Sequence, residues 1–242
     1  MADEEERSPS GAPVYRHKEG KAGISPPEHA ADHLQAIERH LEKHVGTLGM
    51  VWHELVSDLI HLDILTVEPG PDRPWRYLVT SGVSDLPMKV PEGHEEFARV
   101  ELMIALPPGW PMTQAEWQDE ANYWPLRWLK NVGRLPHTYD TWIGWGHTIP
   151  NGDPPERIAN TKFTGFMLTP PYQLAPEFFA LDAPNGDRIH FYMLTPLYAE
   201  ELELKLEKGV EELEKRFEKQ NVDFVLDPNR PNVALKRGWF KW

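Results

Sequence analysis

Two side chains in the first part of the chain have the types and the spacing that metal chemistry requires. His61 and Asp63 lie two residues apart where apolar and polar residues alternate, so both project from one face of a predicted strand. An imidazole beside a carboxylate suits zinc and related divalent metals. His53, Asp85 and His147 are further candidate ligands. The enzyme that these residues would support is a metal-dependent hydrolase using His61, Asp63, Asp85 and His147.

The pattern that would make such a centre catalytic is incomplete. His53-Glu54 begins like the helical zinc-protease motif, but the second histidine four residues after the first is missing. The chain has no cysteine, which excludes thiolate ligands, thiolate nucleophiles and disulfide bonds. Scattered histidines and aspartates usually have structural roles. We therefore expect no catalytic residue, no metal and no cofactor, and a protein that is not an enzyme.

Ser84 and Asp85 could form a nucleophile and its helper, but their surroundings predict a turn. Residues 80–86 read Thr-Ser-Gly-Val-Ser-Asp-Leu, which lacks the Gly-x-Ser-x-Gly pattern of a nucleophile elbow. Gly82 can adopt positive φ, and the two polar side chains can accept hydrogen bonds from nearby backbone N–H groups. We expect Asp85 to cap this turn.

His147 is the best single candidate for a polar group that faces a ligand. It lies between Gly146 and Thr148 and follows Trp142 and Trp145. Aromatic side chains combined with glycine form shaped surfaces for peptides. The alternative is a histidine packed inside the core, since a histidine near aromatic residues is commonly only packed. A second aromatic group is expected to be mostly core: Trp110, Trp117, Trp124 and Trp128.

Composition limits the class of protein and of partner. The 242 residues are 40% hydrophobic, which is enough for a sizeable buried core. A formal net charge of −13 without a basic stripe argues against nucleic acid and favours a neutral to basic protein or peptide. The acidic N-terminus has no apolar segment, and no apolar run is long enough to span a membrane. We expect a cytoplasmic protein without membrane contact, and the oligomeric state stays open.

The elements that must position these residues alternate between helical and strand patterns. Residues 1–23 are polar and charged and are predicted to form a disordered tail, followed by one domain over residues 24–242. Ser25 is the predicted N-cap of the first helix, Pro125 interrupts the helical pattern after a Thr113 capping box, and Thr195 precedes the last helix. The predicted helices cover residues 25–46, 113–124, 125–133 and 197–220, and the last is weakened at Gly209.

The predicted strands cover residues 59–67, 75–80, 98–106, 163–168 and 188–194. The first of them alternates, so we expect one of its faces to be less buried. Short turns join the first three, which favours antiparallel pairing. Asn185-Gly186 predicts a hairpin turn. The fold class is therefore α+β, with a largely antiparallel or mixed sheet and packed helices.

Several segments in order resemble the Suppressor of fused family. The supporting segments are residues 56–63, 80–86 and 100–102, Trp124-Pro125, and residues 146–148. The chain looks most like the shorter, prokaryotic-type members, which are similar to the N-terminal domain of the eukaryotic protein. The resemblance implies that N-terminal-domain fold and a binding scaffold rather than an enzyme.

The family suggests how a partner is held. The eukaryotic protein binds a short peptide of the zinc-finger transcription factors of Hedgehog signalling as an added β-strand between two domains, and bacterial relatives are placed beside polymorphic toxins as immunity proteins. Two family contact positions fall at Arg134 and Gly146, where this chain departs from the family, so the same peptide is not expected to bind. The resemblance thus implies sequestration of another protein or peptide. The expected partner-binding residues are Ser84, Asp85, Arg134, Trp142, Trp145 and His147.

Overall fold

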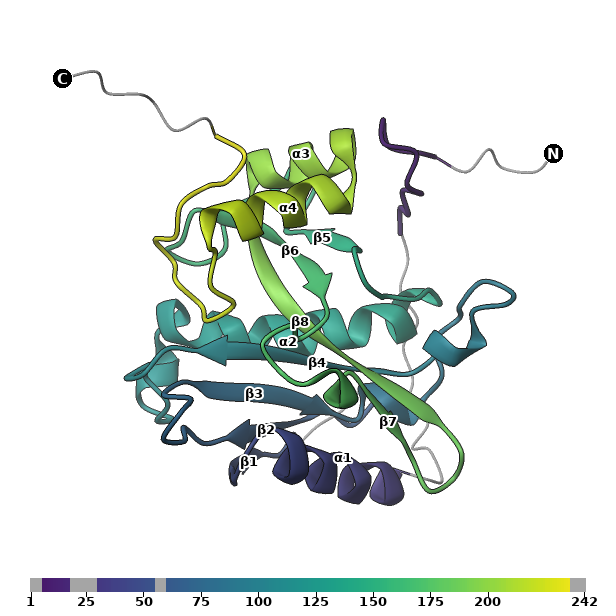
Figure 1. Ribbon diagram of the computed structural model, residues 1–242, viewed down its shortest axis with the longest axis vertical. Helices are drawn as coiled ribbons and strands as arrows, with labels where there is room; N and C mark the ends of the chain where they lie inside the picture. Colours follow the sequence, from purple (N-terminus) through teal and green to yellow (C-terminus); the bar gives the residue numbers. More distant parts are fainter. Residues whose placement is uncertain (1–5, 18–29, 55–59, 236–242) are drawn as a thin grey trace.

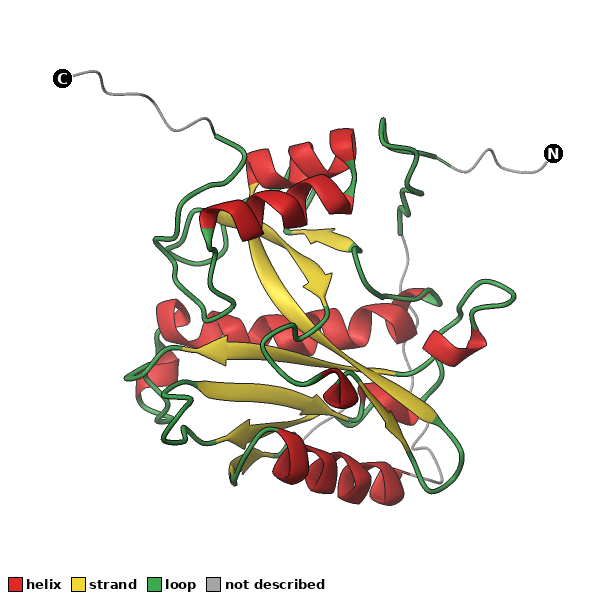
Figure 2. Cartoon of the chain, viewed as in Figure 1, coloured by secondary structure: helices red, strands yellow, loops and turns green. Residues whose placement is uncertain are grey.

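A central mixed sheet with helices on both of its faces forms the architecture (Figures 1 and 2). The computed structural model describes residues 6–17, 30–54 and 60–235. In these residues the strands are β1 (Leu48–Trp52), β2 (Asp63–Val67), β3 (Arg76–Ser81), β4 (Val100–Leu106), β5 (Thr148–Pro150), β6 (Phe163–Thr169), β7 (Ala180–Asp182) and β8 (Arg188–Tyr198). The helices are α1 (Ala30–His44), α2 (Glu120–Tyr139), α3 (Ala199–Lys208) and α4 (Val210–Gln220).

The strand order is β1-β2-β3-β4-β8-β6-β5, and β7 pairs with β8 as a short hairpin. All neighbouring strands are antiparallel except β4 and β8, which run parallel. The predicted α+β class with a mixed sheet is confirmed. The hairpin turn at Asn185-Gly186 is also confirmed, and Gly186 there has a φ of +89°. Strands β1, β5 and β7 were not predicted.

Side chains of the central strands alternate between two cores. In β4, Leu102 and Ile104 belong to the core that α2 covers, while Met103 and Ala105 belong to the core that α1 covers. Every residue of β2 is buried. The prediction of a less buried face was wrong within β2, because helices cover both sides of the sheet, and holds only at His61, which precedes the strand and is exposed. Trp124 and Trp128 are core residues, as predicted.

Helix α2 continues through both of its prolines, so the predicted interruption at Pro125 was wrong. Asp119 caps the helix by accepting the N–H of Ala121 at 2.9 Å. Pro125 removes one helical hydrogen bond, and the buried face of the helix, which includes Trp124, offsets that loss. The capping box at Thr113 exists but closes only a 3₁₀ turn, η3 (Glu116–Gln118).

The chain enters its last helical region later than predicted. Thr195 and Pro196 do not start a helix, because they lie inside β8. Pairing of β8 with β4 extends only to Met193, so proline is tolerated where β8 has a single neighbouring strand. Gly209, with a φ of +88°, separates α3 from α4 and divides the predicted long helix.

The structure describes residues 6–17 of the N-terminal region. Residues 6–17 form a turn in which Arg7 and Pro13 make a backbone bridge, and the N–H of Ser10 donates to the carbonyl of Leu206 in α3 at 2.9 Å. The predicted cap at Ser25 lies outside the described residues, and α1 ends just before Gly46 as predicted. Among the helices that the structure describes, none is long and apolar enough to cross a membrane.

Candidate functional site

The turn after β3 is held by a buried carboxylate from β4. Gly82 has a φ of +118°, and a Cβ there would lie 1.9 Å from the carbonyl oxygen of His61, so only glycine fits. The carboxylate of Glu101 accepts the N–H groups of Gly82 and Ser84, both at 3.0 Å. It also accepts the Ser84 hydroxyl at 2.7 Å. Ser84 is fully buried, and its hydroxyl is already bonded to Glu101.

Asp85 does not cap this turn, and the prediction that it does was wrong. The 3₁₀ turn η1 (Val83–Asp85) has no side-chain cap, because Glu101 already binds its N–H groups. Asp85 is buried, and its carboxylate lies 3.5 Å from Nδ1 of His33 in α1. Burial raises the pKa of Asp85 to about 7, and the nearby Glu101 carboxylate adds to the rise while Arg99 opposes it.

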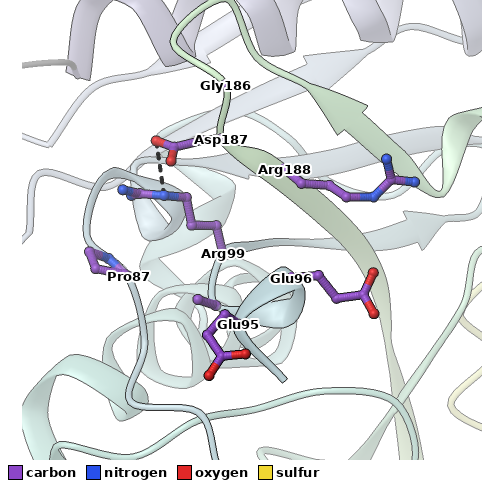
Figure 3. A pocket seen from close by; sticks show the side chains of 8 residues that line it. Pro87, Glu95, Glu96, Arg99, Gly186, Asp187 and Arg188 are labelled. Carbon is purple, nitrogen blue, oxygen red and sulfur yellow. Dashed lines mark ion pairs between the residues drawn. The ribbon is translucent and has the colours of Figure 1, made fainter. Parts of the chain in front are cut away.

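A pocket of about 270 Å³ lies beside this turn, at the tip of the β7–β8 hairpin (Figure 3). The guanidinium of Arg99 donates to the carbonyls of Ser84 and Asp85 at 2.6 and 2.9 Å. Its Nε lies 3.0 Å from the carboxylate of Asp187, as the dashed line in Figure 3 shows. Through these contacts Arg99 joins the turn after β3 to the tip of the β7–β8 hairpin.

A second pocket, also of about 270 Å³, lies where the 81–85 turn meets the end of α2. The ring Nε2 of His137 lies 3.0 Å from the carbonyl of Val83, and Lys89 pairs with Asp140 at 3.2 Å. The residues that line this second pocket are Leu86, Pro87, Met88, Lys89, Pro136, His137 and Asp140. Val83 of the turn therefore contacts His137 of α2, and residues 86–89 line this pocket together with residues 136–140.

Three aromatic side chains precede β5, and Trp145 is the exposed one among them. The rings of Trp142 and His147 meet edge to face with centroids 4.3 Å apart. Burial lowers the pKa of His147 to about 4, and the charge of Lys205 lowers it further, so the imidazole is neutral near pH 7. Trp145 is 50% exposed, and its indole N–H donates to Glu214 of α4 at 3.0 Å.

Arg134 occupies a separate position in α2. Its guanidinium pairs with the carboxylate of Glu54, which lies in the segment after β1. A second cation of α2, Lys130, lies 3.9 Å from the same carboxylate. Arg134 thus links α2 to the β1–β2 region, and the structure records no contact between it and Trp142, Trp145 or His147 in the described part of the chain.

Strand β5 is the last strand on this side of the sheet. It pairs with β6 alone, and backbone bonds to β6 are made at His147 and Asn151. By the alternation of an antiparallel ladder, the N–H and C=O of Thr148 point away from β6. Pro150 offers no N–H, which shortens the edge available for pairing. Residues 6–17 lie near both ends of β5, since the Tyr15 and His147 ring centroids are 6.4 Å apart and Arg16 pairs with Asp153 at 2.8 Å.

The four residues of the hydrolase hypothesis do not converge. His61 and Asp63 are in contact and are joined by His53. Asp85 and His147 are not part of that group: Asp85 lies with His33, and His147 with Trp142. Within residues 6–17, 30–54 and 60–235, no other set of three histidine or carboxylate side chains is close enough to hold one metal ion. The structure therefore carries no hydrolase site of that composition.

Comparisons with known proteins agree with this geometry. The sequence model of the family described as Suppressor of fused protein matches residues 58–231. No curated protein matches the chain in the sequence comparison. A crystal structure of a suppressor of fused homologue from Neisseria gonorrhoeae has a TM-score of 0.55 at 17% identity, over 87% of this chain and 99% of that one. A Sufu–Fu complex crystal structure has a TM-score of 0.57 at 15% identity, over 83% and 92% of the two chains.

Proposed function

Because the chain belongs to the Suppressor of fused family, we propose that it is a non-enzymatic protein-binding module that sequesters a protein or peptide partner. A similar fold occurs in a protein that was crystallised as a Sufu–Fu complex. The proposed action is stoichiometric: the partner is held, and no bond in it is broken. Toxin neutralisation by an immunity protein in the cytoplasm is the form of this function that we favour.

The observation that carries the proposal is that β5 is an edge strand beside the exposed Trp145, with residues 6–17 near both of its ends. Thr148 presents a backbone N–H and C=O that β6 does not use, and Trp145 is half exposed immediately before the strand. An extended segment that adds to a sheet edge gains backbone hydrogen bonds, and neighbouring pockets select its side chains. Tryptophan is among the residues that contribute most to binding energy. We call β5 together with Trp142, Trp145 and His147 the β5 surface.

The other predicted partner-binding residues would act behind this surface. Ser84 is fully buried and Asp85 is nearly so, so they support the turn that borders the second pocket instead of touching a partner. We propose the pocket between residues 86–89 and 136–140 as the site for a partner side chain. Arg134 would contribute only by holding α2 against Glu54.

Charge favours a neutral to basic partner. The formal net charge is −13. Glu214 accepts a hydrogen bond from Trp145, and two nearby carboxylates, Asp140 and Asp153, each pair with a cation. A cationic segment would be attracted over several ångströms, with a dependence on salt. We infer that the partner is a cationic protein domain or peptide.

The test compares variants of the two sheet edges. Protein purified with its native partner is used to identify that partner by mass spectrometry, and affinity is then measured with both purified components. Trp145→Ala and Thr148→Pro, which removes the outward N–H, should each weaken binding about tenfold or more. The matched control is Met50→Ala in β1, at the opposite edge, where Met50 is 57% exposed.

The control variant should bind like the wild type. Far-ultraviolet circular dichroism should show that all three variants are folded. If Trp145→Ala and Thr148→Pro keep wild-type affinity, the partner does not bind at the β5 surface and the proposal fails.

A further inference from the structure

A second group of functional side chains lies at the opposite edge of the sheet, where β1 ends and β2 begins. Nδ1 of His53 is 2.8 Å from one carboxylate oxygen of Asp63, and Nε2 of His61 is 3.0 Å from the other. All three potential ligand atoms lie within 4.8 Å of one another. Since β1 and β5 are the two ends of the strand order, this group is separate from the β5 surface.

The donor atoms match a first-row divalent metal. Two imidazole nitrogens and one carboxylate oxygen are the protein ligands of several zinc sites that keep a further position open. Donors bound to one zinc ion at about 2.1 Å with tetrahedral angles lie about 3.4 Å apart. The side chains of His53 and His61 are 65% and 55% exposed, so small rotations can reach that spacing. Their exposure also leaves the remaining metal positions open to water.

Asp63 is held firmly enough to orient such an ion. Its side chain is only 9% exposed at the start of β2, and one oxygen accepts the backbone N–H of Glu54 at 3.0 Å. Outer hydrogen bonds of this kind fix the direction of a metal-binding carboxylate. The cations that α2 brings to this region, Lys130 and Arg134, pair with Glu54, so the charge of that carboxylate offsets theirs.

We propose that His53, His61 and Asp63 bind one divalent transition metal ion of the zinc class, with water completing its coordination. The ion would bind the folded chain, in which these three side chains lie together, and not the unfolded one, so it would stabilise the folded state. This proposal replaces the sequence-based expectation of a metal-free protein. That expectation relied on the absence of a helical zinc motif. In the structure Asp63 begins β2, and His53 and His61 lie between β1 and β2.

The competing explanation is that both histidines only donate hydrogen bonds to Asp63. Calorimetric titration of zinc chloride into untagged, chelator-treated protein separates the two, with magnesium chloride as the comparison because imidazole does not favour magnesium. The wild type should bind one equivalent of zinc and no magnesium at the same concentrations. His53→Ala and His61→Ala should each weaken zinc binding tenfold or more. His94→Ala, which removes another exposed histidine, should leave zinc binding unchanged.

Thermal unfolding provides a second readout. Zinc at about 100 times its dissociation constant should raise the Tm of the wild type by about 5–10 °C and leave the Tm of both histidine variants unchanged. Absence of saturable zinc binding to the wild type would overturn the proposal. Wild-type zinc affinity in His53→Ala and His61→Ala would also overturn it, because the ion would then bind elsewhere. Trp145→Ala should retain zinc binding, so this test is independent of partner binding.

Discussion

The carboxylate of Glu101 accepts both the backbone N–H and the hydroxyl of Ser84, at 3.0 and 2.7 Å. Through this contact the second half of the turn after β3 is fixed by a fully buried side chain of β4. The carbonyls of the same turn accept bonds from Arg99, and the carbonyl of Val83 contacts His137 of α2. The turn therefore connects β4 and α2 beside both pockets.

We expect Glu101→Ala to lower the free energy of unfolding by about 3–5 kcal/mol, because the N–H groups of Gly82 and Ser84 would lose their buried acceptor. Ser84→Ala removes one of these bonds and should cost about 1 kcal/mol. Urea unfolding at one pH measures both values. Equal losses in the two variants would show that Glu101 is not the main support of the turn.

Asp85 should make stability depend on pH. Burial raises its pKa to about 7, so the folded state favours the protonated carboxyl. The stability that this group contributes is present below about pH 4 and is lost as pH rises to about 7, by up to about 4 kcal/mol. Asp85→Asn removes this dependence. The free energy of unfolding of the variant should therefore rise relative to that of the wild type between pH 4.5 and 8, as measured by urea unfolding. A constant difference across that range would contradict the assignment.

His147 should make stability depend on pH in the opposite direction to Asp85. Burial lowers its pKa to about 4, so the stability it contributes is present above about pH 6.5 and is lost as pH falls toward 4. We expect the imidazole resonances of His147 in nuclear magnetic resonance spectra to show no titration above about pH 5. A His147 midpoint near 6.5 would show that its ring is solvated.

The N-terminal segment should shield the β5 surface. Removing residues 1–17 takes away the ring of Tyr15 near His147 and the pair between Arg16 and Asp153. We expect faster hydrogen exchange over residues 146–153 and an upward shift of the His147 pKa, because its burial decreases. Arg16→Ala serves as the milder control and should change exchange less. Unchanged exchange after the deletion would mean that the segment does not cover this edge.

Charge at the β5 surface should influence association more than dissociation. Asp153→Lys reverses an exposed carboxylate beside β5, while Asp182→Lys reverses one in β7. Asp182 is a matched control for Asp153, since the two side chains are 78% and 79% exposed and each pairs with an arginine. With the identified partner, Asp153→Lys should lower the association rate several-fold at low salt, and Asp182→Lys much less. Equal effects, or an association rate that is independent of salt, would show that net charge serves only solubility.

Local features of the structure could be predicted from the sequence because they depend on neighbouring residues. Gly82 and Gly186 occupy the positive φ positions that their turn sequences indicate. The hairpin around Gly186, the helix that ends just before Gly46 and the core position of Trp124 follow in the same way from turn chemistry, helical spacing and side-chain size. The ordered segments that resemble the family were likewise sufficient to indicate its fold.

Other features were decided only by residues that are distant in sequence. Glu101, not Asp85, binds the turn, because strand pairing places β4 next to β3. Pro125 stays within α2, although local preference ends a helix there, because the buried face of that helix offsets the lost hydrogen bond. His53 joins His61 and Asp63 through the pairing of β1 with β2. Local propensities are worth fractions of a kcal/mol for most residues and about 3 kcal/mol for proline, whereas burial of each large side chain is worth about 1.5–3 kcal/mol. Several buried side chains together therefore outweigh a local preference.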